Sequence, residues 1–235
     1  MSLTSWRKAR AIVVFTGAGM SAESGVPTYR GSGGIWNQYR WQEYACQEAF
    51  ENKPEAVLDF HEKRRKAVLD CIPHAGHKAL ADLETIHPRV TLITQNIDGM
   101  HQRAGSRNVL EIHGSLWRMR CPQHGVQKDL EQAEFAHRQC PSCLAWMRPD
   151  ITWFGDTMDT GLMETAAGAV KRCDLFVSVG TSGVVWPAAG FPQLARESGA
   201  VMVEINPEST PMSHLYQHHL RERASFALVS LFARD

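Results

Sequence analysis

The sequence predicts an α/β fold in which a doubly wound parallel sheet carries a smaller inserted module. Three observations support this prediction: four short apolar runs recur along the 235 residues, helical stretches lie between them, and two segments interrupt the alternation. Short, continuously apolar runs rich in β-branched residues are typical of parallel strands buried on both faces. Strands that alternate with helices are typical of a doubly wound sheet.

The apolar runs predict four strands, and each of them ends in small or polar residues. The runs are Ala11–Thr16, Val90–Thr94, Leu175–Val179 and Val201–Ile205, followed by Gly17-Ala18-Gly19, Gln95-Asn96, Gly180-Thr181-Ser182 and Asn206. Helices are predicted between them, notably over His77–Glu84 and Gly161–Lys171. Ligands of doubly wound sheets bind at the carboxyl ends of the strands. We therefore expect a polar ligand at this edge of the sheet.

Two segments break the alternation and predict the small module. Residues 36–71 are helical and rich in charge, with Pro54 as the first residue of a long helix, a position that proline favours. Residues 119–147 hold paired cysteine and histidine residues and show little apolar periodicity. We therefore expect a helical insertion and a zinc-binding insertion beside the main sheet.

Composition excludes several classes of protein. Apolar residues make up 43% and charged residues 21%, as in a globular protein and unlike a disordered chain. Lys+Arg and Asp+Glu both number 25, so the net charge is zero and no general attraction to nucleic acid or anionic membrane is expected. No run approaches the ~18 apolar residues of a membrane span, and the apolar stretch near the N-terminus is too short for a signal peptide. Because the six cysteines then read as thiols or metal ligands, we expect a cytoplasmic protein.

Four candidate metal ligands have the spacing of a zinc ribbon in which one cysteine has become histidine. Cys121, His124, Cys140 and Cys143 give the pattern C-x2-H-x15-C-x2-C. Each pair lies on a short turn, so all four side chains can face one Zn²⁺ ion. Four protein ligands leave no open position for a substrate, so the ion is expected to be structural. The alternative is two unrelated surface turns.

Six further blocks of sequence stand out: Gly17–Arg30 (GAGMSAESGVPTYR), Thr94–Gly99 (TQNIDG), Glu111–Ser115 (EIHGS), Arg148–Gly155 (RPDITWFG), Gly180–Ser182 (GTS) and Glu204–Asn206 (EIN). In order, and over nearly the whole chain, these blocks resemble the signatures of the sirtuins, which are NAD-dependent protein lysine deacylases. The glycine loop alone is equally consistent with a tight strand-to-helix turn. The resemblance implies deacetylation, with desuccinylation or demalonylation as further activities, and release of nicotinamide and O-acyl-ADP-ribose.

The resemblance implies a set of NAD-binding residues at the predicted strand ends. Gly17, Ala18, Gly19 and Ser21 match the pyrophosphate loop; Ala22, Thr28, Tyr29 and Arg30 match the mobile loop over the nicotinamide ribose; Gln95, Asn96, Ile97 and Asp98 match the ribose and nicotinamide contacts; Gly180, Thr181 and Ser182 match contacts to the phosphates; and Asn206 and Ala224 match contacts to adenosine. The family often has phenylalanine where Tyr29 stands.

His113 matches the catalytic base of the family. With an ordinary pKa of ~6.5, a histidine is largely neutral at pH 7 and can accept a proton. In the family mechanism the acyl oxygen of the modified lysine attacks the ribose C1′ as nicotinamide leaves. The histidine then deprotonates the ribose hydroxyls, so that the 2′-oxygen attacks the resulting alkylimidate. A histidine taken at random is more often structural, and His77 and His101 match family positions of that kind.

The resemblance also implies a site for an acyl-lysine peptide. Ile151, Trp153, Phe154 and Gly155 match the strand beside which the extended peptide adds in the family, an arrangement that leaves sequence preference loose. The alternative for Trp153 and Phe154 is ordinary core.

A bacterial, desuccinylase-like class of the family, to which this sequence is closest, has an alanine and a Tyr-x-x-Arg pair. Ala45 and Arg64 align with the alanine and the arginine, whereas the tyrosine has become His61. Residues three apart share a helix face, so His61 and Arg64 are expected to face one pocket, where the guanidinium suits a carboxylate. We expect His61 to make the preference for succinyl groups fall as the pH rises through about 6–7.5. The alternative is that the run EKRRK is a solvated charged face.

The resemblance implies a division of the chain and a set of partners. Residues 1–35, 75–118 and 148–235 match an NAD-binding, Rossmann-like domain, and residues 36–74 and 119–147 match the small domain. Acyl-lysine proteins are the expected partners, and a monomer is expected. One alternative is ADP-ribosyl transfer or NAD hydrolysis in the same pocket, and another is an NAD sensor or a zinc-ribbon nucleic-acid module. The matched peptide strand and His113 favour deacylation, and the zero net charge argues against nucleic acid.

Overall fold

The computed structural model describes residues 3–29 and 33–233, and the larger part of it is built around a six-stranded parallel sheet. Its strand order is β3-β2-β1-β7-β8-β9, and all pairs are parallel. The strands are β1 (Ile12–Thr16), β2 (Val90–Thr94), β3 (Val109–Glu111), β7 (Leu175–Val179), β8 (Val201–Ile205) and β9 (His218–Leu220). The four predicted strands are confirmed, and the prediction missed the two short edge strands β3 and β9.

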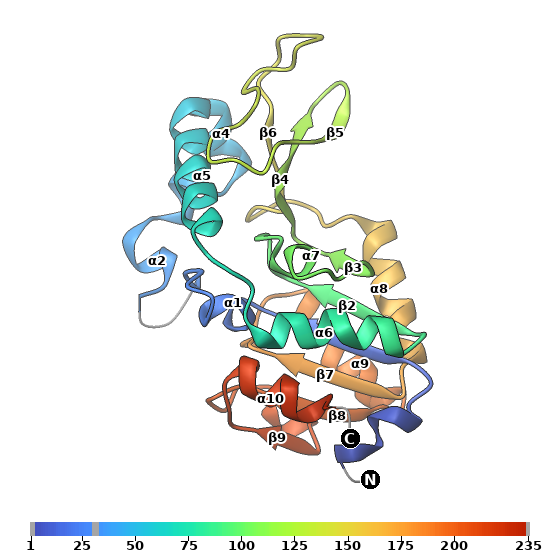
Figure 1. Cartoon of the computed structure of the whole chain (residues 1–235). Helices are drawn as coiled ribbons and strands as arrows, with labels where there is room; N and C mark the ends of the chain where they lie inside the picture. Colours follow the sequence, from blue (N-terminus) through green and yellow to red (C-terminus); the bar gives the residue numbers. More distant parts are fainter. Residues whose placement is uncertain (1–2, 30–32, 234–235) are drawn as a thin grey trace.

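Helices cover both faces of this sheet (Figure 1). The helices α6 (Ala75–Ile86) and α10 (Ala224–Leu231) pack on one face, and α8 (Thr160–Arg172) and α9 (Phe191–Glu197) pack on the other. The central strand β1 divides its side chains between the two layers: Ile12 and Val14 join the first hydrophobic cluster, and Val13 and Phe15 join the second. Alternate side chains of a strand point to opposite faces, so burial of all five β1 residues requires both layers. The predicted doubly wound fold is confirmed.

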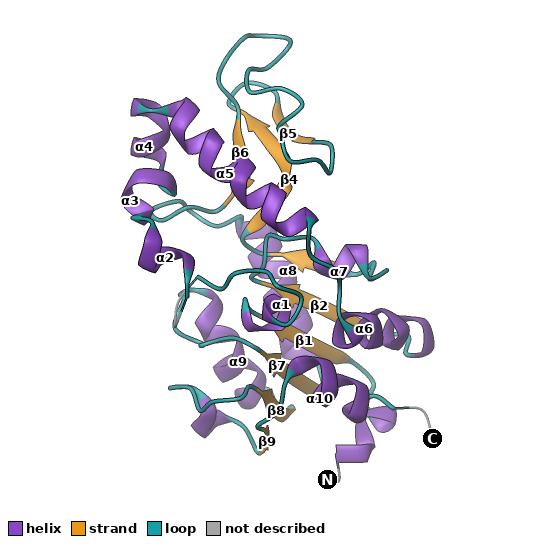
Figure 2. Cartoon of the chain, turned by 60° about the vertical axis from the view of Figure 1, so that its left-hand side comes forward, coloured by secondary structure: helices purple, strands orange, loops and turns teal. Residues whose placement is uncertain are grey.

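A small antiparallel sheet and four helices lie beyond the carboxyl edge of the parallel sheet (Figure 2). Its strands, in the order β5-β4-β6, are β4 (Gly114–Cys121), β5 (Gly125–Lys128) and β6 (Arg148–Ile151). The helices are α2 (Ile35–Gln38), α3 (Trp41–Tyr44), α4 (Gln47–Asn52) and α5 (Pro54–Leu69), and α5 begins at the predicted proline. The small sheet reaches beyond residues 119–147 on both sides.

A buried arginine joins the helical and zinc-binding parts of this module. Arg65 on α5 is fully buried, pairs with Asp129 at 2.6 Å, and lies over the rings of Trp117 and Phe135. Its guanidinium also donates to the carbonyls of Gln132 and Leu130, so the buried charge is hydrogen-bonded on several sides.

The remaining helical elements are short. They are α1 (Gly19–Ala22), α7 (Met100–Arg103) and the 3-10 turns η1 (Leu3–Lys8), η2 (Ala188–Gly190) and η3 (Ser213–Leu215). None of the helices over residues 3–29 and 33–233 has the length and apolar character needed to cross a membrane.

Candidate active site

A cavity of about 1030 Å³, here called the central cavity, lies where the carboxyl ends of the parallel strands face the small module. Residues that follow β1, β2, β7 and β8 line it from one side, and residues of the helical insertion and the segment after β6 line it from the other. The predicted site residues that line it are Gly17, Ala18, Gly19, Ala22, Thr28, Tyr29, Ala45, His61, Arg64, Gln95, Asn96, Ile97, His113, Ile151, Trp153, Phe154, Gly155, Gly180, Thr181, Ser182, Asn206 and Ala224.

Two predicted residues, Ser21 and Asp98, lie behind the wall of the central cavity rather than on it. The Asn96 amide, which does line the cavity, donates to Ser21 Oγ at 3.3 Å and to the Gly17 carbonyl at 3.0 Å. Asp98 Oδ1 accepts from the Met100 N–H at 2.9 Å, and burial raises the pKa of the Asp98 carboxyl. Ser21 therefore braces Asn96 in the cavity wall, and Asp98 is hydrogen-bonded behind it. Arg30, which was predicted with them, lies outside the described residues.

The glycine loop after β1 packs directly against the loop after β7. A Cβ atom on Gly17 would lie 2.7 Å from the Thr181 side chain, and one on Gly19 would lie 2.8 Å from Gly180. Gly180 itself has a φ of +58°, a conformation that favours glycine. The loop is thus a tight turn whose glycines also bring two backbones together at the cavity, where a phosphate group can approach them closely.

His113 is placed as a proton acceptor. Its Nδ1 lies 3.0 Å from the carbonyl oxygen of Gln95, which can only accept, so Nδ1 carries the hydrogen and Nε2 keeps its lone pair. Burial lowers the pKa of His113, so the ring is neutral at pH 7. The backbone of His113 is fixed as well, because its carbonyl accepts from the Thr152 N–H at 2.9 Å.

Two other histidines near the cavity have structural roles. His101 lies 3.0 Å from Thr16 Oγ1, and His77 lies 3.4 Å from Ser21 Oγ. Burial lowers the pKa of His77 to about 2 and that of His101 to about 4, so both rings are neutral hydrogen-bonding groups at physiological pH. This agrees with the expectation for these two positions.

His61 and Arg64 reach the central cavity from the same face of α5, but their chemistry differs from the expectation. Burial lowers the pKa of His61 to about 3, and its ring stacks on Trp153 with 5.8 Å between centroids. His61 therefore stays neutral between pH 6 and 7.5, which contradicts the change of His61 charge on which the expected pH dependence of acyl preference is based. Arg64 is half-buried, and its Nη2 donates to the hydroxyl of Tyr29 at 2.8 Å.

The solvated-face alternative for EKRRK holds only for its two lysines. Lys63 and Lys66 are exposed, whereas Arg65 is buried in the small module and Arg64 lines the central cavity. A helix turns by about 100° per residue, so neighbouring residues of the run face in different directions.

Trp153 and Phe154 divide between core and cleft. Trp153 is buried beneath the guanidinium of Arg148, which lies 3.6 Å from its ring centroid. Phe154 is 38% exposed and packs on Trp41 with 4.6 Å between ring centroids. The Phe154 N–H donates to the carbonyl of Ala45 at 3.1 Å, which ties the segment after β6 to the helical insertion.

The four predicted metal ligands meet at one point. The ligand atoms of Cys121, His124, Cys140 and Cys143 all lie within 4.8 Å of one another. His124 Nδ1 is 3.5 Å from Cys121 Sγ and 3.3 Å from Cys140 Sγ, and the sulfurs of Cys121 and Cys143 are 3.6 Å apart. Tetrahedral Zn²⁺ with bonds of ~2.3 Å places its ligand atoms about 3.7 Å apart. The cluster is thus consistent with a structural zinc site, not with two unrelated turns.

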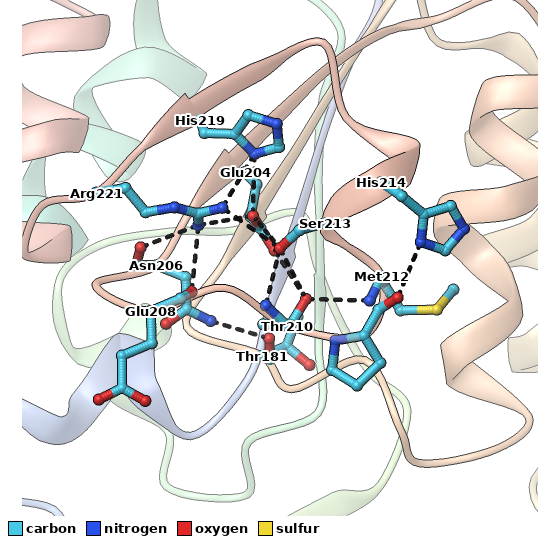
Figure 3. A network of polar contacts seen from close by, with 11 residues as sticks. Thr181, Glu204, Asn206, Glu208, Thr210, Met212, Ser213, His214, His219 and Arg221 are labelled. Atoms are coloured by element: carbon cyan, nitrogen blue, oxygen red, sulfur yellow. Dashed lines mark hydrogen bonds and ion pairs between the residues drawn. The ribbon is translucent and has the colours of Figure 1, made fainter.

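Sequence reasoning missed a buried polar network at the far end of the cavity (Figure 3). Glu204 on β8 accepts from Thr210 Oγ1 at 2.9 Å, from Ser213 Oγ at 2.7 Å and from Arg221 Nη1 at 2.7 Å. Arg221 Nη1 also lies 3.3 Å from the carbonyl of Asn206 and 3.2 Å from that of Glu208. This network fixes the loop over residues 207–211, all of which line the cavity. A glutamate inside an apolar strand was the signal in the sequence.

The fold and the cavity together define a class of protein. It is a doubly wound α/β protein whose strand ends carry a glycine loop of the kind that binds nucleotides. A neutral histidine and a second module face this loop across a cleft. Comparison with known families matches residues 17–187 to the Sir2 family. The chain therefore belongs to the Sir2 family.

Relatives along the whole chain agree. An NAD-dependent protein deacylase of Aquifex aeolicus is 40% identical over 223 residues, which are 94% of this chain and 93% of the relative. NAD-dependent protein deacylase 2 of Pyrobaculum aerophilum is 43% identical over 223 residues, 94% of this chain and 90% of the relative. The chain is accordingly an NAD-dependent protein deacylase.

Solved structures support the same assignment. A Sir2 homologue in complex with NAD superposes with a TM-score of 0.90 at 38% identity, over 98% of this chain and 91% of that one. A Sir2 mutant with a deacetylated p53 peptide and 3′-O-acetyl ADP-ribose superposes with a TM-score of 0.84 at 29% identity, over 96% of this chain and 94% of that one.

Proposed function

We propose that this enzyme removes acyl groups from lysine side chains of proteins that bind as extended peptides in the central cavity, with His113 as the base. The observation that carries this proposal is the neutral His113 ring, held by Gln95 between the strand-end loops and the segment after β6. Deprotonation of a ribose hydroxyl needs a neutral base with a free lone pair, which His113 Nε2 provides. Assay of acetyl-, succinyl- and longer-acyl-lysine peptides with NAD, followed by mass spectrometry, tests the proposal.

We infer that the strand-end side of the cavity takes NAD. The backbone of Gly17, Ala18 and Gly19 meets the pyrophosphate, supported by Gly180, Thr181 and Ser182 from the facing loop. The loop with Ala22, Thr28 and Tyr29 closes over the nicotinamide ribose. Nicotinamide binds at Asn96 and Ile97, which lie in front of Ser21 and Asp98. The ribose contacts Gln95. Asn206, whose amide donates to the Thr181 carbonyl at 3.1 Å, and Ala224 meet adenosine. Their common position on the cavity wall supports these roles.

The peptide is proposed to add beside the segment after β6, in the cleft below the small module. The exposed Phe154 ring, near Gly155 and Ile151, offers an apolar surface for the methylene groups of the acyl-lysine, while Trp153 packs behind it. The p53 peptide bound by a structurally similar enzyme supports a peptide substrate. Backbone pairing would leave sequence selectivity loose.

The acyl group is proposed to point toward Ala45 and Arg64, which would admit succinyl or malonyl as well as acetyl groups. Arg64 is half-buried in the cavity wall, and among the described residues no carboxylate forms an ion pair with it. A guanidinium that forms no ion pair suits the terminal carboxylate of such acyl groups.

Replacing Arg64 by methionine is expected to lower the ratio of kcat/KM for succinyl-lysine over acetyl-lysine peptides by roughly tenfold to a hundredfold. A charge-assisted hydrogen bond contributes ~1.5–3 kcal/mol to binding of the succinyl group. Acetyl-lysine has no carboxylate that could form this bond, so its turnover should not depend on it. Lys63→Met removes an equal charge from the exposed face of the same helix and should leave the ratio unchanged. An unchanged ratio in Arg64→Met would end the carboxylate role.

Replacing Glu204 by glutamine is expected to raise the KM for NAD by about tenfold, with a smaller effect on kcat. Glutamine carries no charge and has one acceptor oxygen, so it cannot accept from Thr210 at one oxygen and from Arg221 at the other as the carboxylate does, and the loop over residues 207–211 loses part of its anchor. Glu164→Gln, at an exposed position of α8, is the matched control. Steady-state kinetics with NAD varied at saturating peptide separate the two constants; an unchanged KM would contradict the anchoring role.

We further infer that residues 1–35, 75–118 and 148–235 form the NAD-binding part and that residues 36–74 and 119–147 form the part that shapes the acyl-lysine site. None of the six cysteines, all of which lie in the described part of the chain, forms a disulfide bond, which supports a cytoplasmic location. The monomeric state remains a prediction, and sedimentation tests it.

A further inference from the structure

Tyr29 joins the acyl side of the central cavity to its NAD side. It lies in the segment that follows α1, yet its hydroxyl accepts from Arg64 Nη2 on α5, 35 residues away, at 2.8 Å. The guanidinium also lies over the Tyr29 ring, 4.8 Å from its centroid. The ring packs on Trp36 with 5.7 Å between centroids, so the phenol is held by contacts on two sides. All three side chains line the central cavity.

His61, in the same wall, has buried ring nitrogens without hydrogen-bond partners in the described part of the chain. It is only 1% exposed, and neither ring nitrogen has a partner at hydrogen-bonding distance among the described residues. The Tyr44 backbone offsets only part of the lowering of the His61 pKa by burial. A buried polar group without a partner costs free energy, so a polar ligand atom in this part of the cavity would be stabilised.

We propose that Tyr29 is a specificity-determining residue whose hydroxyl, together with the Arg64 guanidinium, binds the carboxylate of a dicarboxylic acyl group. Tyr29 thereby supplies from the NAD loop the phenol that α5 lacks, where His61 stands in the Tyr-x-x-Arg pattern. This inference rests on the proposed carboxylate role of Arg64.

The hydrogen-bond count supports this assignment. Arg64 donates to the Tyr29 oxygen, so the hydroxyl hydrogen of Tyr29 remains free to donate to a ligand. Arg64 has further N–H groups, and an ionised carboxylate offers about four acceptor positions and no donor. A carboxylate can therefore accept from both side chains without breaking the bond between them. Acetyl-lysine presents no such group.

The same contact couples acyl recognition to NAD. A carboxylate that holds Tyr29 against Arg64 also orders the loop segment that is proposed to close over the nicotinamide ribose. Coupling between two ligands is reciprocal, so NAD should bind more tightly beside a succinyl-lysine peptide than beside its acetyl counterpart. Tyr29→Phe should reduce this difference.

The test measures kcat/KM for paired succinyl and acetyl peptides in the wild-type enzyme, in Tyr29→Phe and in Arg64→Met. Phenylalanine keeps the ring and removes only the hydroxyl, so the succinyl-to-acetyl ratio should fall by roughly tenfold to a hundredfold, the effect of one hydrogen bond to an ionised carboxylate (~1.5–3 kcal/mol). Tyr39→Phe removes a hydroxyl from the small module outside the cavity and should leave the ratio unchanged. Taking the ratio cancels any change that affects both peptides equally.

The outcomes separate the two proposals. A ratio that falls in both Tyr29→Phe and Arg64→Met supports the shared site. A ratio that falls in Arg64→Met alone overturns the role of Tyr29 and leaves that of Arg64. A ratio that falls in neither variant, or a wild-type enzyme without succinyl turnover, overturns the carboxylate pocket itself. A ratio that falls only in Tyr29→Phe contradicts a shared site.

Discussion

Replacement of His113 by alanine is expected to lower kcat for deacylation by about 10²–10⁴-fold, the contribution of a positioned general base. The hydrogen bond from His113 Nδ1 to the Gln95 carbonyl fixes the tautomer, and alanine offers no proton acceptor in its place. NAD affinity should largely survive, because the strand-end loops make most of the proposed contacts. Single-turnover kinetics and NAD titration measure the two effects separately.

Two controls make this result specific. His137→Ala changes an exposed histidine of the zinc-binding segment and should retain wild-type turnover. In the wild-type enzyme, burial lowers the pKa of His113, and the base must be neutral to act. The acidic limb of kcat/KM should therefore have its inflection below the ordinary histidine value of ~6.5. Wild-type turnover in His113→Ala would show that another group is the base.

Replacement of Cys140 by serine is expected to abolish tight zinc binding, to lower the melting temperature and to reduce activity. In small zinc sites the apparent binding free energy of ~10–16 kcal/mol contributes to folding. The cluster closes the turns on both sides of residues 125–139, and Arg65 links this segment to α5 beside the cavity. Elemental analysis should find about one zinc per chain in the wild-type protein and little in the variant.

Cys46→Ser is the matched control, because Cys46 lies in the helical insertion and donates only to the Gln42 carbonyl. It should retain zinc and stability. His124→Cys should also retain the ion, since thiolate is an equally suitable ligand. A metal-free protein that melts and turns over like the zinc form would contradict the structural role.

The sequence was sufficient to predict the strands whose side chains are buried on both faces. The run over β7 (Leu175–Val179) is buried at every position, so its composition is apolar throughout. The edge strands β3 and β9 have three residues each, and β9 consists of His218, His219 and Leu220 with partly exposed side chains. Such segments form because a neighbouring strand offers backbone partners, which local composition does not reveal.

The site was predictable where chemistry depends on local sequence and not where it depends on distant packing. The glycine loop and the cysteine pairs are local patterns, and their residues come together as expected. The neutral state of His61 arises from its burial beside Trp153, 92 positions further along the chain, and the partner of Arg64 comes from the loop before α2. Glu204 was missed as an anchor because its partners are spread over residues 210–221.

The central claim is that NAD is consumed in order to remove an acyl group from lysine. The most direct test measures nicotinamide release from NAD with an acyl-lysine peptide, with the same peptide unmodified, and with no peptide, while mass spectrometry follows the products. We expect release only with the acylated peptide, with one free lysine and one O-acyl-ADP-ribose formed for each nicotinamide. Release at the same rate without acyl-lysine, or ADP-ribose attached to protein, would contradict the account and indicate NAD hydrolysis or ADP-ribosyl transfer instead.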